Sequence, residues 1–300
     1  MRLFKKKQLF PDTNFKVSQD SDNVYIEDFD EEIVEETTLP LNMDSCIDSN
    51  EEMSVSYINN NILSEDNTDV LTVLDIENIE DYKYQCMDKV ITVNLINRIN
   101  YLGNSSFAFC ESLKDFNFVT PVDNLIIDNY CFRDCFNLTN FNFKGQITKI
   151  GSNAFSNCKK LKTINLESLT SISDNTFLFN MSLNNIKIPN VKIIECGAFM
   201  YCRSLQNIDL SICSKLKEIH SYAFSSCDLH TLHIPRNVEL IDGYVFEENY
   251  NLIDVYFDHT DKDNIEIGND IFKECKNVIV HTTNKTIIDY CKEFNYTLAR

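Results

Sequence analysis

Cysteine is the residue type in this chain with the widest possible chemistry. The sequence contains twelve cysteines, and thiolates bind zinc, form disulfides and act as nucleophiles. A structural zinc site takes its ligands from several closely spaced pairs. The chain offers one such pair, Cys131 and Cys135. We therefore predict no metal site.

The histidines and polar loops also lack a catalytic pattern. His230 and His233 lie three residues apart near a strand, so their side chains point to opposite faces and chelate poorly. The sequence contains no phosphate-binding or dinucleotide-binding glycine motif and no recognisable nucleophile motif. The acidic loop 258–263 lacks the glycine and distal glutamate of an EF-hand, which favours a solvated loop. We expect no catalytic residues and no cofactor, and predict that the protein is not an enzyme.

The acidic residues are concentrated near the start of the chain. Residues 1–90 hold 22 acidic and 7 basic residues (net −15), and residues 91–300 hold 24 and 20 (net −4), which sum to −19. This charge disfavours nucleic acid and anionic membranes as partners. It favours solubility and basic partners.

Residues 1–68 predict a disordered acidic tail, because they bury too little apolar surface to offset the entropy of ordering. The alternative is an acidic-hydrophobic docking motif around Tyr25, Ile26 and Phe29. The sequence shows neither a signal-peptide apolar region nor an apolar run of transmembrane length. A cytoplasmic location is the default expectation, and the cell surface is the other possibility.

A repeat of about 23 residues explains half of the cysteines. Its eight units align on Phe107, Phe132, Phe155, Phe177, Phe199, Phe224, Phe246 and Phe272. The third residue after each Phe is Cys or Asn: Cys110, Cys135, Cys158, Asn180, Cys202, Cys227, Asn249 and Cys275. A position that accepts either residue suits a side chain that bonds to the backbone of a turn. We interpret these cysteines as buried reduced thiols, since disulfides between neighbouring units would need a different geometry.

Each unit ends in a Leu-x-x-Ile-x-Leu pattern, as at residues 161–166, whose alternation predicts a short strand. Only stacking of units buries the apolar face of this strand, so neighbouring strands should pair in parallel about 4.8 Å apart. Seven such steps predict a ladder about 35 Å long. The Ala-Phe-x-x-Cys segment predicts a helical turn on the opposite wall, with the Phe directed inward.

Three regions follow the tail. Residues 69–98 predict an irregular N-terminal cap or first coil, and residues 99–282 hold about eight repeats. Residues 283–300 predict a C-terminal cap of helix and strand, because the apolar residues of 287–294 have helical spacing.

The repeats resemble the BspA-type leucine-rich repeat. Residues 194–205 (IECGAFMYCRSL) are close to the consensus of that family, as is the proline that closes some strands, at Pro189 and Pro235. The resemblance covers residues 99–282. It implies the fold class α/β, as a leucine-rich-repeat right-handed solenoid with a concave parallel β-sheet. It also implies a role in adhesion or protein binding.

Polar strand positions are the candidate partner-binding residues, because a concave sheet presents them side by side. They are Asp115, Asn117, Asn140, Asn142, Thr163, Asn165, Asn185, Lys187, Asn207, Asp209, His233 and Tyr256. The simpler alternative is that they only solvate the sheet. Our first hypothesis is a monomeric, non-enzymatic scaffold that binds a protein partner of unknown identity on this face. The second is a surface adhesion protein that binds host protein or glycan.

Overall fold

The computed structural model describes residues 15–20, 23–28, 61–63, 69–73 and 77–300. The chain divides into two units, Met1–Ser54 and Val55–Arg300. In the first unit, β1 (Phe15–Asp20) and β2 (Asn23–Asp28) pair antiparallel, and β2 contains Tyr25 and Ile26 of the possible docking motif. Phe29 and most of the tail that we predict to be disordered lie outside the described residues.

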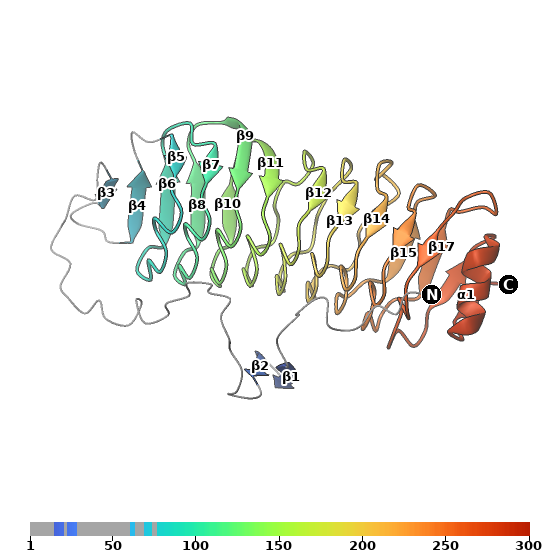
Figure 1. Cartoon of the computed structure of the whole chain (residues 1–300). Coiled ribbons are helices and arrows are strands. Elements are labelled where there is room, and N and C mark those ends of the chain that lie inside the picture. The colour runs from blue at the N-terminus through green and yellow to red at the C-terminus, as the bar shows by residue number, and fades with distance from the viewer. Residues whose placement is uncertain (1–14, 21–22, 29–60, 64–68, 74–76) are drawn as a thin grey trace, which may run out of the picture. The chain divides into compact units, whose positions relative to one another are not determined.

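In the second unit, successive coils lie side by side and form a solenoid (Figure 1). A first ladder contains strands of the Leu-x-x-Ile-x-Leu type: β3 (Asn61–Leu63), β4 (Val70–Val73), β6 (Thr92–Leu95), β8 (Asp115–Phe118), β10 (Asn140–Asn142), β15 (Thr231–Ile234), β17 (Asp254–Phe257), β19 (Ile279–His281) and β20 (Thr297–Leu298). Its strands pair in parallel, except that β3 is antiparallel to β4. The predicted solenoid of parallel strands is confirmed.

A second parallel ladder, which the sequence analysis does not anticipate, precedes the core Phe of each coil. Its strands are β5 (Asn78–Ile79), β7 (Tyr101–Leu102), β9 (Val122–Ile127), β11 (Gly145–Ile150), β12 (Ser171–Ile172), β13 (Ile193–Ile194), β14 (Glu218–Ile219), β16 (Leu240–Ile241) and β18 (Glu266–Ile267). From Gly103 onward, the residue after the aliphatic one donates its N–H to the preceding coil, as Gly151 does to the Ile127 carbonyl at 2.9 Å; the exception is Ser173. The aliphatic position five residues before each Phe is thus both a core residue and a strand residue.

The segment around each Phe is a series of tight turns, so the predicted helical turn is wrong. In the coil of Phe132, Tyr130 and Asp134 have left-handed φ angles of 57° and 60°. A left-handed residue at the third position of a turn reverses the chain without starting a helix. The backbone N–H of Phe132 donates to the Ala154 carbonyl of the next coil at 2.7 Å. The turns therefore form a third hydrogen-bonded wall.

The phenylalanines form a continuous stack through the core. All eight are at most 1% exposed, and neighbouring rings are stacked with centroids 5.1–5.9 Å apart. Tyr84 occupies the equivalent position one coil earlier and stacks on Phe107 at 5.2 Å. The repeated backbone therefore also includes the coil of Tyr84, whose Phe is replaced by another aromatic residue.

The Cys or Asn that follows each Phe bonds to the backbone, as predicted. Each of these eight side chains donates to the carbonyl of the core aromatic residue in the preceding coil, at 3.1–3.2 Å for Cys and 2.7 and 2.8 Å for Asn. The cysteines of the described part are all free thiols. The prediction that this column bonds to the backbone is confirmed, and the reduced state of its thiols stays a prediction.

The first ladder is interrupted where the type of coil changes. Between β10 and β15 the described chain has only one isolated bridge in this ladder, from Thr163 to Asn185. Before the interruption, the six-residue strands β9 and β11 lead into the second ladder. After it, the chain turns tightly, with the Leu169 N–H donating to the Leu166 carbonyl at 3.1 Å. The ladder of about 35 Å that we predict is therefore not continuous.

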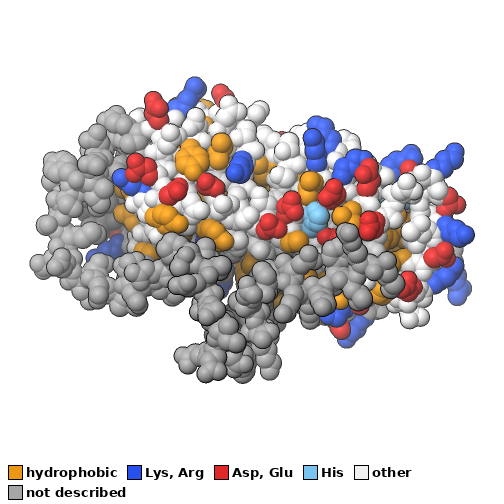
Figure 2. All heavy atoms as spheres, in the orientation of Figure 1, with side chains coloured by type: hydrophobic (Ala, Val, Ile, Leu, Met, Phe, Trp, Pro, Cys, Tyr) orange, Lys and Arg blue, Asp and Glu red, His pale blue; other side chains and the backbone are white. Residues whose placement is uncertain are grey.

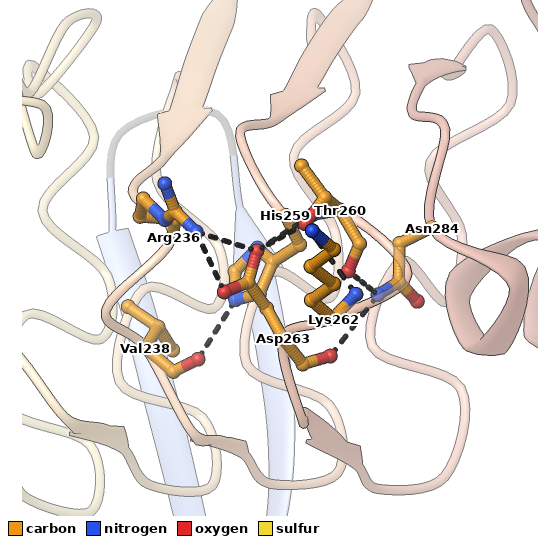
Figure 3. A network of polar contacts seen from close by, with 7 residues as sticks. All are labelled: Arg236, Val238, His259, Thr260, Lys262, Asp263 and Asn284. Carbon is orange, nitrogen blue, oxygen red and sulfur yellow. Dashed lines mark hydrogen bonds and ion pairs between the residues drawn. The ribbon is translucent and has the colours of Figure 1, made fainter.

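The last segment closes the solenoid with helix α1 (Lys285–Glu293) and β20. Asn284 is the helix N-cap, and its side-chain oxygen accepts a bond from the Ile287 N–H. Its amide nitrogen donates to the carbonyls of Thr260 at 2.6 Å and Asp263 at 3.2 Å (Figure 3). Most of the loop is exposed, as predicted, and its backbone carbonyls also tie the cap to the preceding coil.

Candidate functional site

The predicted partner-binding residues lie along the segments of the first ladder. Each of the twelve is exposed or half-buried, whereas the apolar residues between them are mostly buried. Alternation of side chains in an extended chain explains this arrangement. The prediction that these residues bind a partner is not tested by their exposure. Their existing contacts divide them into groups with different capacities to bind a partner.

At the N-terminal end, asparagine side chains bond to one another between coils. Asn142 donates to Asn117 at 2.7 Å, and Asn117 donates to Asn94 at 2.9 Å. Asn140 donates to Asp115 at 2.6 Å. Part of the hydrogen-bonding capacity of these residues is thus already used to hold the sheet together.

At the C-terminal end, aromatic and imidazole rings stack across three strands. The Tyr256 ring lies 4.6 Å from that of His233 and 4.2 Å from that of His281. His281 Nε2 lies 2.8 Å from an Asp254 carboxylate oxygen. The sequence analysis misses His281 because the last unit is shifted by one position; its pairing with Tyr256 in the ladder identifies it.

Asn165 and Asp209 bond to the backbone immediately after their strands. Asn165 Oδ1 accepts a bond from the Glu167 N–H at 3.0 Å, and Asp209 Oδ1 accepts one from the Ser211 N–H at 3.0 Å. Asn and Asp commonly stabilise turns by accepting from the backbone two residues on. These two side chains therefore help to shape the tight turns that lead to the second ladder.

Thr163, Asn185, Lys187 and Asn207 have no side-chain hydrogen bond or ion pair within the described chain. All four are exposed. Because no contact among the described residues uses their polar groups, these are the predicted residues most available to a partner. They cluster in the middle of the face, where the first ladder is interrupted.

A hollow of about 330 Å³ lies at this interruption. Its lining residues are Phe141, Phe143, Ile147, Thr163, Ile164, Asn165, Leu166, Glu167, Asn185 and Lys187. The structure thus brings together Thr163, Asn185 and Lys187 beside apolar side chains. We name this site the central hollow.

Phe141 and Phe143 are the lining residues that sequence reasoning misses. Both occupy positions that the repeat assigns to the core, yet each is only partly buried. The next coil does not continue the strand pairing of β10, so it does not cover these rings as fully as the neighbouring strands β6 and β10 cover Phe116. The sequence carries no clear signal for them, because a change of connection length such as that between Ile234–Ile241 and Phe257–Ile267 leaves both ladders paired.

His220 is the centre of a separate charged cluster on the second ladder. Its Nδ1 lies 2.8 Å from Asp242, and its Nε2 lies 3.2 Å from Glu218 and 3.8 Å from Glu195. The hydrogen bond with Asp242 raises the pKa of His220, burial opposes this shift, and the carboxylates of all three acids support it. Burial is also the main cause that raises the pKa of Glu195. Within the described residues, no group of three or more His, Cys, Asp or Glu side chains is arranged to hold a metal ion.

A family model for the BspA type leucine rich repeat region matches the chain in six copies, over residues 45–125, 125–253 and 170–297. The chain belongs to this BspA-type family. The match includes residues on the N-terminal side of Leu102, consistent with the repeated backbone around Tyr84. No curated protein matches the chain.

Among solved structures, the chain matches leucine-rich repeat proteins. A leucine-rich repeat protein from Bacteroides ovatus is 21% identical with a TM-score of 0.57, and the match covers 72% of this chain and 63% of that protein. A leucine rich cell surface protein from Faecalibacterium prausnitzii is 19% identical with a TM-score of 0.43, over 74% of this chain and 86% of that one. The BspA-type chain therefore shares its fold with the first of these, and the match spans less than two thirds of that protein's length.

Among the described residues, no helix is both long and apolar enough to cross a membrane. Figure 2 shows acidic, basic and hydrophobic side chains interspersed on one face of the molecule. Charge is therefore mixed locally on this face, and the net charge of the whole chain does not describe each part of the surface.

Proposed function

We propose that this BspA-type protein is a non-enzymatic, monomeric scaffold that binds a protein partner on its concave face, with the central hollow as the main contact. The observation that carries this proposal is that Thr163, Asn185 and Lys187 are exposed and without side-chain partners in the described chain, beside apolar lining residues. Interfaces derive most of their energy from a few apolar anchors enclosed by polar contacts. The central hollow supplies both.

The remaining residues of the face can make fewer new contacts with a partner. The Asn94–Asn117–Asn142 ladder and the His233–Tyr256–His281 stack are held by contacts within the protein. Such residues are rigid before a partner arrives, so they lose little side-chain entropy on binding. They flank the central hollow and extend the surface over which a partner can be held.

The proposal is tested by blocking the central hollow with bulk. In the double variant Thr163→Arg and Asn185→Arg, two long side chains occupy the space over the hollow, and capture of the native partner should fall strongly. The matched control is Thr170→Arg with Ser171→Arg, two exposed positions at the second ladder with the same change in charge. Partner capture is measured by affinity purification and quantitative mass spectrometry. Equal capture by the hollow variant and the control would reject the central hollow as the contact.

A second candidate function is adhesion at the cell surface. It is favoured by the exposed asparagine side chains at Asn140 and Asn142, whose amides suit hydroxyl-rich ligands such as glycans. The cytoplasmic location expected by default has no support from family membership. Protease treatment of intact cells distinguishes the two: loss of the repeats while an internal marker survives supports adhesion, and survival of the repeats supports the intracellular scaffold.

A further inference from the structure

The middle of the solenoid has the opposite charge to the chain as a whole. Residues 141–192 contain seven lysines and no arginine, against one Asp and one Glu, which gives a net charge of +5 in a chain of net −19. Interactions between exposed charges are screened beyond a distance of about 10 Å at 0.1 M salt. A ligand at the central hollow therefore responds mainly to the local positive charge.

Three of these lysines belong to the central hollow or adjoin it. Lys187 lines it, Lys162 immediately precedes the lining residue Thr163, and Lys144 immediately follows the lining residue Phe143. All three are exposed, and within the described chain none of them forms an ion pair. Glu167 is the one acidic lining residue.

Other lysines of the segment have different surroundings. Lys159 lies over the Phe136 ring at 5.2 Å, and Lys160 donates to Asn137 at 2.6 Å. Lys149 and Lys192 are exposed at the second ladder, in β11 and immediately before β13. Among the lysines of residues 141–192, those that lie at the first ladder and make no side-chain contact are therefore the three at the central hollow.

We propose that the central hollow binds an extended acidic peptide segment of a partner protein. One aromatic or aliphatic side chain of the segment enters the hollow beside Phe141 and Phe143, and its carboxylates lie near Lys144, Lys162 and Lys187. This inference rests on the proposed function and specifies the chemistry of its partner. It reverses the preference for basic partners that the net charge predicts, because the segment that contains the central hollow has a net positive charge.

The geometry also explains why both features of the peptide are needed. Exposed ion pairs each contribute little, so three lysines alone give weak and salt-sensitive attraction. An apolar side chain in a partly enclosed hollow adds the burial of apolar surface, which salt does not screen. An acidic segment without an apolar residue should therefore bind more weakly than one that has it.

The test uses fluorescence anisotropy with the full chain and labelled synthetic peptides of about twelve residues, which span about 40 Å when extended. The first peptide has Asp and Glu around a central Phe, the second replaces the Phe by Ser, and the third replaces the acids by Lys. A heparin oligosaccharide of similar length supplies negative charge without an apolar group. We expect saturable binding that is strongest for the first peptide and weakens with salt.

The test variant is Lys144→Gln with Lys162→Gln and Lys187→Gln, and its matched control is Lys149→Gln with Lys192→Gln and Lys276→Gln, which has the same loss of charge. The test variant should weaken binding of the first peptide about tenfold, as expected for three exposed charges. The control should change it less than about twofold, because none of its lysines lines the hollow or adjoins a lining residue in the sequence. Circular dichroism and thermal melting establish that both variants fold.

Several results would overturn the proposal: no saturable binding up to millimolar peptide, equal effects of the two variants, or tightest binding of the lysine peptide. Tighter binding of heparin with no effect of Phe→Ser would assign the site to a polyanion instead. The lysine test variant is also used in the partner-capture assay. Partner capture that is lost with the Thr163 and Asn185 variant but retained with the lysine variant would reject the acidic chemistry while the scaffold function stands.

Discussion

The ring of Phe177 lies parallel to that of Phe199 in the next coil, with 5.4 Å between the centroids and 6° between the planes. On its other side, the Phe155 ring is 5.7 Å away. Each core phenylalanine within the stack therefore contacts its equivalent in both neighbouring coils. The repeat is held together by the same residue that defines it in the sequence.

Replacing Phe177 by Ala should lower the free energy of unfolding by about 3–5 kcal/mol, because the substitution leaves a cavity between two rings. The measurement is urea denaturation followed by circular dichroism. Tyr250→Ala is the control: Tyr250 is 58% exposed, and its loss should change stability by about 0.5 kcal/mol or less. An unchanged midpoint for the Phe177 variant would contradict the role of the stack.

Asn180 should tolerate Cys but not Leu. Its amide donates to the Phe155 carbonyl at 2.7 Å, and a cysteine makes the same bond in six other coils. Asn180→Cys keeps a donor and removes the buried Oδ1 that has no partner among the described residues. We expect the free energy of unfolding to change by less than about 1 kcal/mol for Asn180→Cys. It should fall by about 1–3 kcal/mol for Asn180→Leu, because leucine leaves the carbonyl unbonded. Thermal melting of the two variants compares them directly, and equal losses would contradict the hydrogen-bond role.

Gly145 should not accept a side chain. Its φ is +139°, and an added Cβ would lie 1.7 Å from the Val122 carbonyl oxygen of the neighbouring strand. Gly145→Ala should therefore destabilise the protein by about 2–4 kcal/mol. Gly243→Ala is the comparison, since its Cβ would meet its nearest atom at 3.0 Å, and it should cost less. A denaturation midpoint for Gly145→Ala that is no lower than the midpoint for Gly243→Ala would contradict this role of Gly145.

The His220 cluster should make stability depend on pH. Its hydrogen bond with Asp242 raises the folded-state pKa of His220, so protonation of His220 favours folding. This contribution is fully present below the ordinary histidine pKa of about 6.5 and is lost as the pH rises through the raised value. The difference in unfolding free energy between wild type and His220→Gln should shrink as the pH rises above about 6.5 and through the raised pKa of His220. Asp242→Asn removes the main cause of the shift, and a wild-type dependence that persists in this variant would contradict the assignment.

The repeat positions could be predicted from the sequence because each has one physical requirement. The Phe position needs a large apolar side chain at every coil, and the next core position needs a donor for a buried carbonyl, which both Cys and Asn supply. Such positions recur at a nearly constant spacing, and eight copies make the pattern evident. The solenoid, its inward phenylalanines and the Cys or Asn column that bonds to the backbone follow from them.

The second ladder and the left-handed turns could not be predicted in the same way. A two-residue strand such as Ile193–Ile194 has no alternation to detect, and bonding to neighbouring coils determines its conformation. Bulky residues with left-handed φ, such as Tyr201 and Tyr222, are unfavourable in isolation. The hydrogen bonds of the turn wall impose that backbone conformation, so the intrinsic φ preference of these residues predicts the wrong conformation.

The candidate site could be predicted only as a surface. The spacing of the polar positions identifies the face, but it does not distinguish Asn142, whose amide bonds to Asn117, from Asn185, which has no side-chain bond in the described chain. The central hollow lies where the first ladder is interrupted, after β10. That interruption depends on how neighbouring coils pair, which no single repeat contains.

The interruption also makes one junction between neighbouring coils, which we call the seam, weaker than the others. No strand pair joins β11 to β12, and the Ser173 hydroxyl bonds to the Ile150 carbonyl at 2.7 Å where other coils use a backbone N–H. In an array whose coils contact only their neighbours, opening begins at the weakest junction. Amide exchange should thus reveal two cooperative blocks that part near this seam before either block melts. A ligand in the central hollow contacts coils on both sides of the seam, so its binding would oppose separation of the two blocks when the array is stretched.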